Sequence, residues 1–216
     1  MKLLSEKRAM ERLSEIQAKF ADLIRSKYEH RAKSCATCDT PGACCLDEHF
    51  VNVRISRLEA RLIEKTLQML PAGKQKEIYE RVETSVAKYG LSEAGDTVVR
   101  TFACPLYERR TGCLVHNKAK PLPCINHACY ERREDLPPDE LLAAEELRVN
   151  ELNFKTYGKN SPWLPLPAAL LFNSSQPAAG NRHGNQQDKE DQVIPNGDVT
   201  PICSLDQYAD HQEHNA

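Results

Sequence analysis

The sequence SCATCDTPGACCLDEH, from Ser34 to His49, places four cysteines in one short loop. They are Cys35, Cys38, Cys44 and Cys45. The C-x2-C step from Cys35 to Cys38 allows a tight turn to bring two thiolates to the same side, where one tetrahedral ion or one region of a cluster can bind both. The loop therefore predicts a thiolate metal site that holds the surrounding chain in place.

A second cysteine-rich loop follows about sixty residues later and also contributes four thiols. They are Cys104, Cys113, Cys124 and Cys129. In the first loop Cys44 and Cys45 are adjacent, and because neighbouring side chains diverge, both reaching one ion would strain the peptide between them. We predict that all eight cysteines bind metal and that the adjacent pair serves different metal atoms, either two zinc ions or a multi-iron cluster.

The residue types limit the metal class without fixing its identity. Thiolates select zinc, copper(I) and iron–sulfur clusters and reject magnesium and calcium. Cys104 is followed by Pro105, a step found in ferredoxin-type cluster loops, which favours iron–sulfur. His116 and His127 lie inside the second loop, and each is either a ligand or an ordinary surface histidine.

The expected compartment is a reducing one, and the N-terminal sequence and the number of cysteines support this expectation. The first twenty residues lack the continuous apolar region of a signal peptide, and no apolar run reaches the ~18 residues that span a bilayer, so we expect a cytoplasmic protein without a membrane segment. Nine cysteines is an odd number, which together with this compartment argues against a disulfide framework. The ninth, Cys203, lies far from both loops and is interpreted as a spare thiol.

Charge is nearly balanced over the 216 residues, with a formal net of −2, so nucleic acid is not favoured as a partner. Basic residues are in excess only between Arg100 and Arg133, where they would compensate an anionic thiolate–metal centre. A nucleic-acid patch is the weaker explanation, because few aromatic residues are interleaved and no zinc-finger spacing is present.

The fold class expected is mainly α, with irregular cysteine loops pinned by metal; a small α+β arrangement stays open. Residues 1–33 predict an amphipathic helix that covers the domain or pairs with a partner helix. Ser56 and Glu59 form a capping-box pattern for a second helix, Gly90 ends a third, and Asp139 begins a final one.

Three segments make up the expected organisation. Residues 1–33 are the N-terminal helix, 34–155 the cysteine-cluster metal-binding domain, and 159–216 a low-complexity tail that is largely disordered. Within the last segment, Trp163 to Phe172 is apolar enough to dock on the domain.

The cysteine pattern resembles that of the YkgJ-type cysteine-cluster proteins, a family described as a zinc- or iron-chelating domain. The resemblance covers roughly residues 33 to 133 and rests on the first-loop cysteines and on "VRISRLEA", "CPLYERRTGCLVH", "KPLPC" and "ACYERR". The gap from Cys38 to Cys44 is longer than in the family, and His116 and Lys120 replace its usual tyrosine and arginine. The resemblance implies that the eight cysteines chelate metal.

Three functions are compatible with these features. The first is a protein that holds an iron–sulfur cluster or zinc, with a redox or electron-transfer role if iron is present. The second is an interaction module in which structural zinc shapes a surface for protein or RNA, with the N-terminal helix as the docking element. The third is a metal-dependent oxidoreductase or modifying enzyme; no catalytic residues are identified, and only Asp47, Glu48 and His49, next to the first loop, are candidates.

Overall fold

The computed structural model describes residues 3–33, 42–46, 51–91 and 100–174, and this part of the chain is mainly helical, as the sequence predicts. Its α-helices are α1 (Glu6–Lys27), α2 (Ala43–Leu46), α3 (Arg57–Leu67), α4 (Ala72–Tyr89), α5 (Leu122–Asn126), α6 (Asp139–Tyr157) and α7 (Leu166–Ser174). Two short 3-10 helices are η1 (Glu29–Arg31) and η3 (Arg133–Asp135). The strands are β1 (Arg54–Ile55), β2 (Tyr107–Glu108), β3 (Gly112–Cys113) and β4 (Leu164–Pro165), which form two small antiparallel pairs, β1–β4 and β2–β3.

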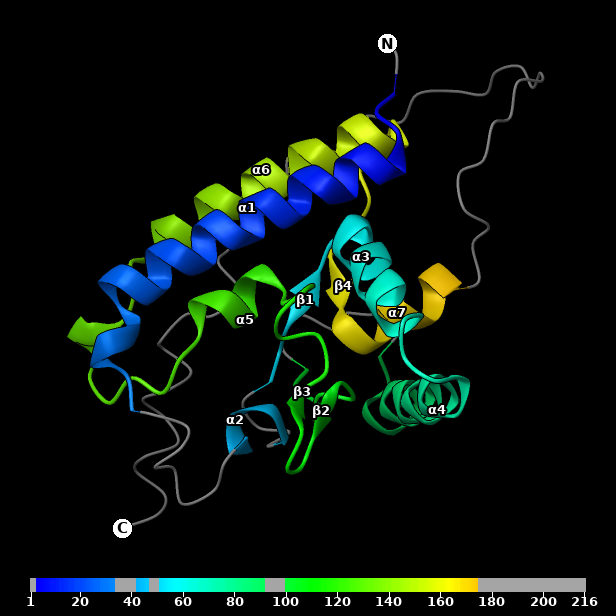
Figure 1. Cartoon of the computed structure of the whole chain (residues 1–216), viewed down its shortest axis with the longest axis horizontal. Coiled ribbons are helices and arrows are strands. Elements are labelled where there is room, and N and C mark those ends of the chain that lie inside the picture. The colour runs from blue at the N-terminus through cyan, green and yellow to red at the C-terminus, as the bar shows by residue number, and fades with distance from the viewer. Residues whose placement is uncertain (1–2, 34–41, 47–50, 92–99, 175–216) are drawn as a thin grey trace.

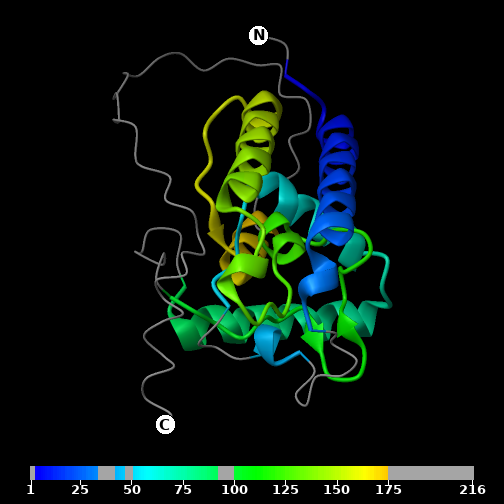
Figure 2. The same cartoon turned by 90° about the vertical axis from the view of Figure 1, so that its left-hand side faces the viewer.

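The helices form layers around one hydrophobic core. Helices α1 and α6 lie side by side along one side of the molecule, as Figure 1 shows, while α4 crosses the opposite side (Figure 2). Helices α3 and α7 lie between these layers and contact each other, and α7 also contacts α4. The part of the chain that the structure describes contains no helix long and apolar enough to cross a membrane.

Helix α1 is an integral part of this core. Ser5 caps its N-terminus by accepting a hydrogen bond from the Arg8 N–H, and its buried positions recur at steps of three and four. These positions are Ala9, Leu13, Gln17, Phe20 and Ile24. The helix packs against α3, α5 and α6, so the apolar face predicted from the sequence covers the domain.

Helix α3 begins at the predicted capping box. The Ser56 hydroxyl accepts a hydrogen bond from the Glu59 N–H, and the Glu59 carboxylate accepts from the Ser56 N–H at 2.9 Å. The same carboxylate accepts from the Leu122 N–H at 3.3 Å, which joins α3 to α5 across a wide gap in sequence. Burial raises the pKa of Glu59, and these hydrogen bonds offset part of that effect.

Two helices end immediately before a glycine, and the end at Gly90 was predicted from the sequence. Helix α4 ends before Gly90, whose φ of 60° is left-handed, and α6 ends before Gly158, with a φ of 72°. The helix predicted to begin at Asp139 is α6, and it runs to Tyr157, slightly beyond the predicted end near Phe154. It is not the last helix, because α7 follows it.

The segment after α6 returns to the core. Strand β4 pairs with β1, with Arg54 opposite Pro165, and α7 buries Leu166 and Leu170 against α3 and α4. The docking predicted for residues 163–172 is confirmed, and the tail predicted from residue 159 overlaps folded structure through 174. A helix buried on all sides shows no amphipathic period, so the sequence pattern did not reveal it. Residues 175–216, with Cys203, lie outside the described residues.

Gln17 of α1 and Glu146 of α6 are buried polar residues that lie at the same height along this pair of helices. Tyr157 donates to Glu6 at 2.8 Å at one end of this antiparallel pair, and Gln17 and Glu146 each lie eleven residues, about three turns, further along. Both are almost fully buried. Among the described residues, Gln17 Nε2 and Glu146 Oε1 have no hydrogen-bond partner. Burial, and then the nearby Glu59, raise the pKa of Glu146 to about 7.

Replacing Glu59 with alanine removes the acceptor for the Ser56 and Leu122 N–H groups. We expect Glu59→Ala to lower the free energy of unfolding by about 2–4 kcal/mol, from the lost cap and the unsatisfied donors. Urea unfolding followed by circular dichroism measures this change. The exposed Glu83→Ala on α4 is the control, and equal losses in both variants would contradict the role assigned to Glu59.

The buried Glu146 predicts a pH-dependent stability. Because its pKa is raised to about 7 from 4.5, the folded state holds a proton that the unfolded state releases, so stability falls as pH rises from 4.5 through 7. We expect Glu146→Gln to remove up to about 3 kcal/mol of this loss. Urea unfolding of both proteins across this range tests it, and parallel pH profiles would contradict it.

Candidate metal centre

Six of the eight predicted ligands lie in the described residues, all half-buried and none in a disulfide. Cys44 and Cys45 are in α2, Cys113 is in β3, and Cys124 is in α5; Cys104 and Cys129 are in the adjoining loops. Figure 1 shows α2 and the β2–β3 hairpin together on the side of the molecule away from α1 and α6. Cys35 and Cys38 lie outside the described residues, as do the candidate residues Asp47, Glu48 and His49.

Gly42 sets the position of the first-loop cysteines. Its carbonyl accepts hydrogen bonds from the N–H groups of Cys45 at 2.9 Å and Leu46 at 3.0 Å, which start α2. Its φ of 81° is left-handed, and a Cβ there would overlap the Tyr107 ring. The Tyr107 ring therefore packs directly on this glycine. Because Tyr107 is opposite Cys113 in the β2–β3 pair, the contact joins α2 to the hairpin.

A backbone bond links the two cysteine loops directly. The Cys104 N–H donates to the Cys45 carbonyl at 2.7 Å, and the Phe102 N–H donates to the Val51 carbonyl at 2.8 Å. Phe102 and Cys104 thus lie beside Val51 and Cys45. The hairpin then returns the chain, so Cys104 and Cys113 come close together.

Helix α5 holds Cys124 between two buried side chains, Leu122 and Ile125. The Leu122 N–H is bound by Glu59, so this cysteine is positioned from the hydrophobic core. Cys129 follows α5, and its carbonyl accepts from the Lys33 N–H at 2.8 Å. The second loop is therefore attached to the chain two residues before Cys35.

Four thiols from three segments influence one another electrostatically: Cys45, Cys104, Cys113 and Cys124. Burial raises the pKa of Cys104 to about 12, and the Cys113 thiol adds to the effect. Burial raises the pKa of Cys124 well above its ordinary value, with Cys104 and Cys113 next in importance. The pKa of Cys113 is raised by its burial. These thiols therefore favour their protonated form unless a cation stabilises the charge.

Cys44 differs from its neighbour. A hydrogen bond from Cys45 lowers the pKa of Cys44 to about 4, and a hydrogen bond from His127 is the next cause. The bond donated to Cys44 raises the pKa of Cys45, and so do burial and the charges of Cys44, Cys104 and Cys124. The adjacent side chains thus have different neighbours: Cys45 is near Cys104 and Cys124, whereas Cys44 is near His127.

The two histidines of the second loop also differ in their neighbours. His127 is exposed and lies beside Cys44. Burial and Lys120 lower the pKa of His116, and the other groups acting on it are Glu29 and Arg25, with no cysteine among them. The structure therefore favours His127 over His116 as a candidate ligand.

Two basic side chains, Lys120 and Arg81, lie close enough to the thiols to favour their negatively charged form. Lys120 lowers the pKa values of Cys113 and Cys124, and Arg81 does the same for Cys104. Lys120 belongs to the basic segment recognised in the sequence. Arg81 lies on α4, far from either cysteine loop in sequence, so no local pattern could have identified it.

A groove of about 550 Å³ gives access to this region. It runs between α4 and the β2–β3 hairpin, and Cys104 and Leu46 are part of its lining. Glu108 lies on its wall and pairs with Lys74 at 2.6 Å and Arg81 at 2.9 Å. A small molecule or ion can therefore approach Cys104 from solvent.

Within residues 3–33, 42–46, 51–91 and 100–174, no three His, Cys, Asp or Glu side chains are arranged to hold a metal ion. The described thiols are thus neighbours but not a closed ligand set. No family model, curated protein or solved structure matches this chain.

The contact between Gly42 and Tyr107 predicts a position-specific effect of a single methyl group. We expect Gly42→Ala to lower the free energy of unfolding by at least about 1 kcal/mol, because of its left-handed φ, with an added cost for displacing the Tyr107 ring. Gly73→Ala is the matched control, since a Cβ there meets nothing within 4 Å. Urea unfolding compares the two, and an unaffected Gly42→Ala protein would contradict this packing.

Proposed function

We propose that this protein binds metal through cysteine thiolates from its two loops, holding either zinc or an iron–sulfur cluster. The observation that carries the proposal is the convergence of Cys45, Cys104, Cys113 and Cys124 from α2, the hairpin and α5. The six cysteines of the described residues are free thiols, which fits a reducing compartment such as the cytosol. The resemblance of the cysteine spacing to YkgJ-type proteins supports the same function.

The neighbours of the adjacent cysteines support binding to different metal atoms. Cys45 lies near Cys104 and Cys124, which in turn lie near Cys113. These four thiols are of the type that zinc or one cluster accepts, and we propose that a bound metal would draw them into one ligand set. Cys44 belongs with His127, and the loop residues Cys35, Cys38 and Cys129 are further candidates for its group. The Lys33–Cys129 backbone bond supports including Cys129, because it attaches that cysteine close to Cys35 in sequence.

A bound metal cation would stabilise the negative charge that these thiols carry once they lose their protons. Their raised pKa values mean that ligation replaces protons, as thiolate metal sites require. When bound, zinc supplies a structural crosslink, whereas an iron–sulfur cluster supplies one-electron redox chemistry. The chain's own residues position the thiols: Gly42 and Tyr107 place α2, and Glu59 places α5.

Two alternatives keep specific support. Because the cysteines join α2, the hairpin and α5, a structural zinc that shapes an interaction surface for protein or RNA fits their positions. The groove beside Cys104 is the observation in favour of a metal-dependent oxidoreductase or modifying enzyme, since it would admit a substrate.

Metal analysis of anaerobically purified protein tests the proposal. We expect stoichiometric zinc, or iron with acid-labile sulfide and visible absorption, and we expect Cys124→Ser to lose at least about half of the metal. Cys203→Ser, outside both loops, is the control and should keep the full content. Metal-free wild-type protein, or equal content in all three proteins, would contradict the proposal. Colour separates a cluster from structural zinc.

A further inference from the structure

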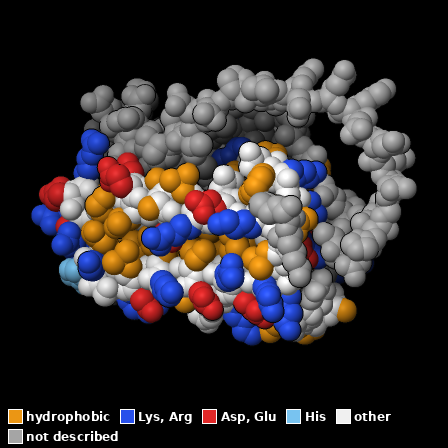
Figure 3. Space-filling view, turned by 90° about the horizontal axis from the view of Figure 1, so that it is seen from above, with side chains coloured by type: hydrophobic (Ala, Val, Ile, Leu, Met, Phe, Trp, Pro, Cys, Tyr) orange, Lys and Arg blue, Asp and Glu red, His pale blue; other side chains and the backbone are white. Residues whose placement is uncertain are grey.

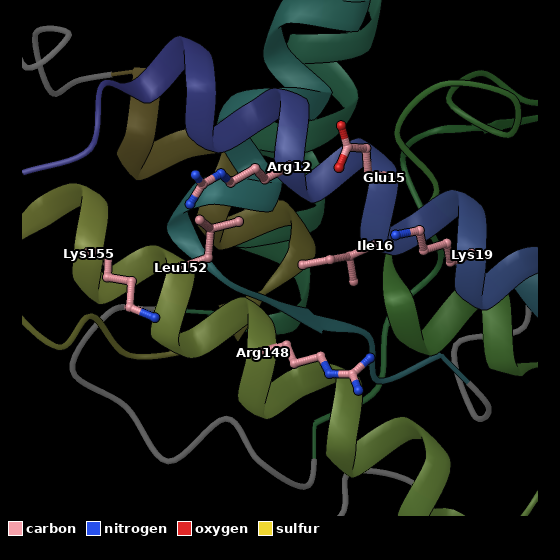
Figure 4. A pocket seen from close by; sticks show the side chains of 7 residues that line it. All are labelled: Arg12, Glu15, Ile16, Lys19, Arg148, Leu152 and Lys155. Atoms are coloured by element: carbon pink, nitrogen blue, oxygen red, sulfur yellow. The ribbon is translucent and has the colours of Figure 1, made fainter.

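A second feature lies on the opposite side of the molecule, between the antiparallel helices α1 and α6. A groove of about 300 Å³ runs along the surface between them. Its lining residues are Arg12, Glu15, Ile16 and Lys19 from α1 and Arg148, Leu152 and Lys155 from α6. Figure 4 shows Ile16 pointing from α1 toward α6, with Leu152 pointing back from the other side. The groove thus has an apolar floor between two charged rims.

The rims repeat with the same period. Arg12 and Lys19 are seven residues apart on α1, and Arg148 and Lys155 are seven apart on α6, which is about 10 Å along each helix axis. On the α6 rim, Arg148 pairs with Glu145 at 2.7 Å and Lys155 with Glu151 at 3.1 Å. Within the described residues, Arg12 and Lys19 form no ion pair.

The floor limits what can fill this groove. Leu152 is buried and Ile16 half-buried, and Figure 3 shows apolar side chains forming a band on this face, with both basic and acidic side chains over and beside it. A nucleic-acid backbone would match the cations but not the floor, and no aromatic residue lines the groove for bases to stack on. A second copy of this chain would place the same cations against one another.

We propose that the α1–α6 groove binds an acidic amphipathic helix of a partner protein. Two helices that lie side by side with a groove between them can accept a third helix along that groove, as in other helix-in-groove complexes. The apolar stripe of the partner helix would cover Ile16, which is the half-buried residue of the floor. Carboxylates at heptad spacing beside that stripe would reach Arg12 and Lys19, which lack ion-pair partners in the described structure. This interaction does not depend on metal binding.

A synthetic helical peptide provides the probe. It has about 20 residues, with leucine along one stripe and glutamate beside it, and a second peptide replaces each glutamate with lysine. Fluorescence anisotropy measures the binding of each labelled peptide to the full chain at low and raised salt. We expect only the acidic peptide to bind, and its affinity to fall as salt rises.

The variant that tests the groove is Arg12→Glu with Lys19→Glu, which we expect to weaken binding by at least about tenfold. Lys65→Glu with Lys76→Glu makes the same charge change at exposed positions of α3 and α4 and should bind as the wild type does. Circular dichroism confirms that each variant is folded. Should the first double variant unfold, Arg12→Gln with Lys19→Gln replaces it, with the same direction expected.

Four outcomes would overturn the inference: no binding of the acidic peptide, equal binding of both peptides, equal weakening in both double variants, or salt-independent binding. Displacement of the probe by a peptide of residues 188–213 would instead assign the groove to the acidic end of this chain. Displacement by double-stranded RNA would assign it to nucleic acid. Self-association that is lost in the Arg12→Glu, Lys19→Glu variant would assign it to a second copy.

Discussion

The rest of the structure depends on the hydrogen bonds that the buried Glu59 carboxylate accepts. Glu59 is buried with 1% of its surface exposed, which is costly for an acid unless its oxygens are hydrogen-bonded. The Ser56 N–H and hydroxyl bind Oε2, and the Leu122 N–H binds Oε1. One side chain therefore starts α3 and fixes α5 against it. Since α5 carries Cys124, the position of a candidate metal ligand is set by the capping of a core helix.

Burial of apolar side chains holds the helix layers, and directional contacts add to it in the cysteine region. Helices α1, α3 and α7 bury mainly apolar side chains, and their positions follow from area removed from water. The cysteine region combines buried apolar residues such as Phe102, Leu106 and Leu122 with directional contacts. These contacts are the Cys45–Cys104 backbone bond, the Tyr107 ring on Gly42, and the bridge from Lys33 to Cys129. Such contacts fix direction as well as distance, which a ligand set requires.

Local patterns in the sequence predicted local structure well. The Ser56–Glu59 capping box, the glycine at the end of α4 and the amphipathic period of α1 are all confirmed, because each depends on residues within one or two turns. Helix α7 and the β1–β4 pair were less visible, since burial on all sides removes the period and strand pairing joins distant residues. For the same reason, the proximity of His127 to Cys44 and the charge from Arg81 became visible only in the folded structure.

The α1–α6 groove and the cysteine region lie on opposite sides, yet they share one chain segment. Helix α1 forms one rim of the groove and ends at Lys27. The 3-10 helix η1 follows and leads to Lys33, whose N–H donates to the Cys129 carbonyl. It also packs against α5, which carries Cys124. A helix bound in the groove would press on the outer face of α1 while its inner face contacts α5. Any effect of a partner on the cysteines would therefore pass along α1 itself, through contacts that are already part of the fold, and would need no rearrangement of the helix layers.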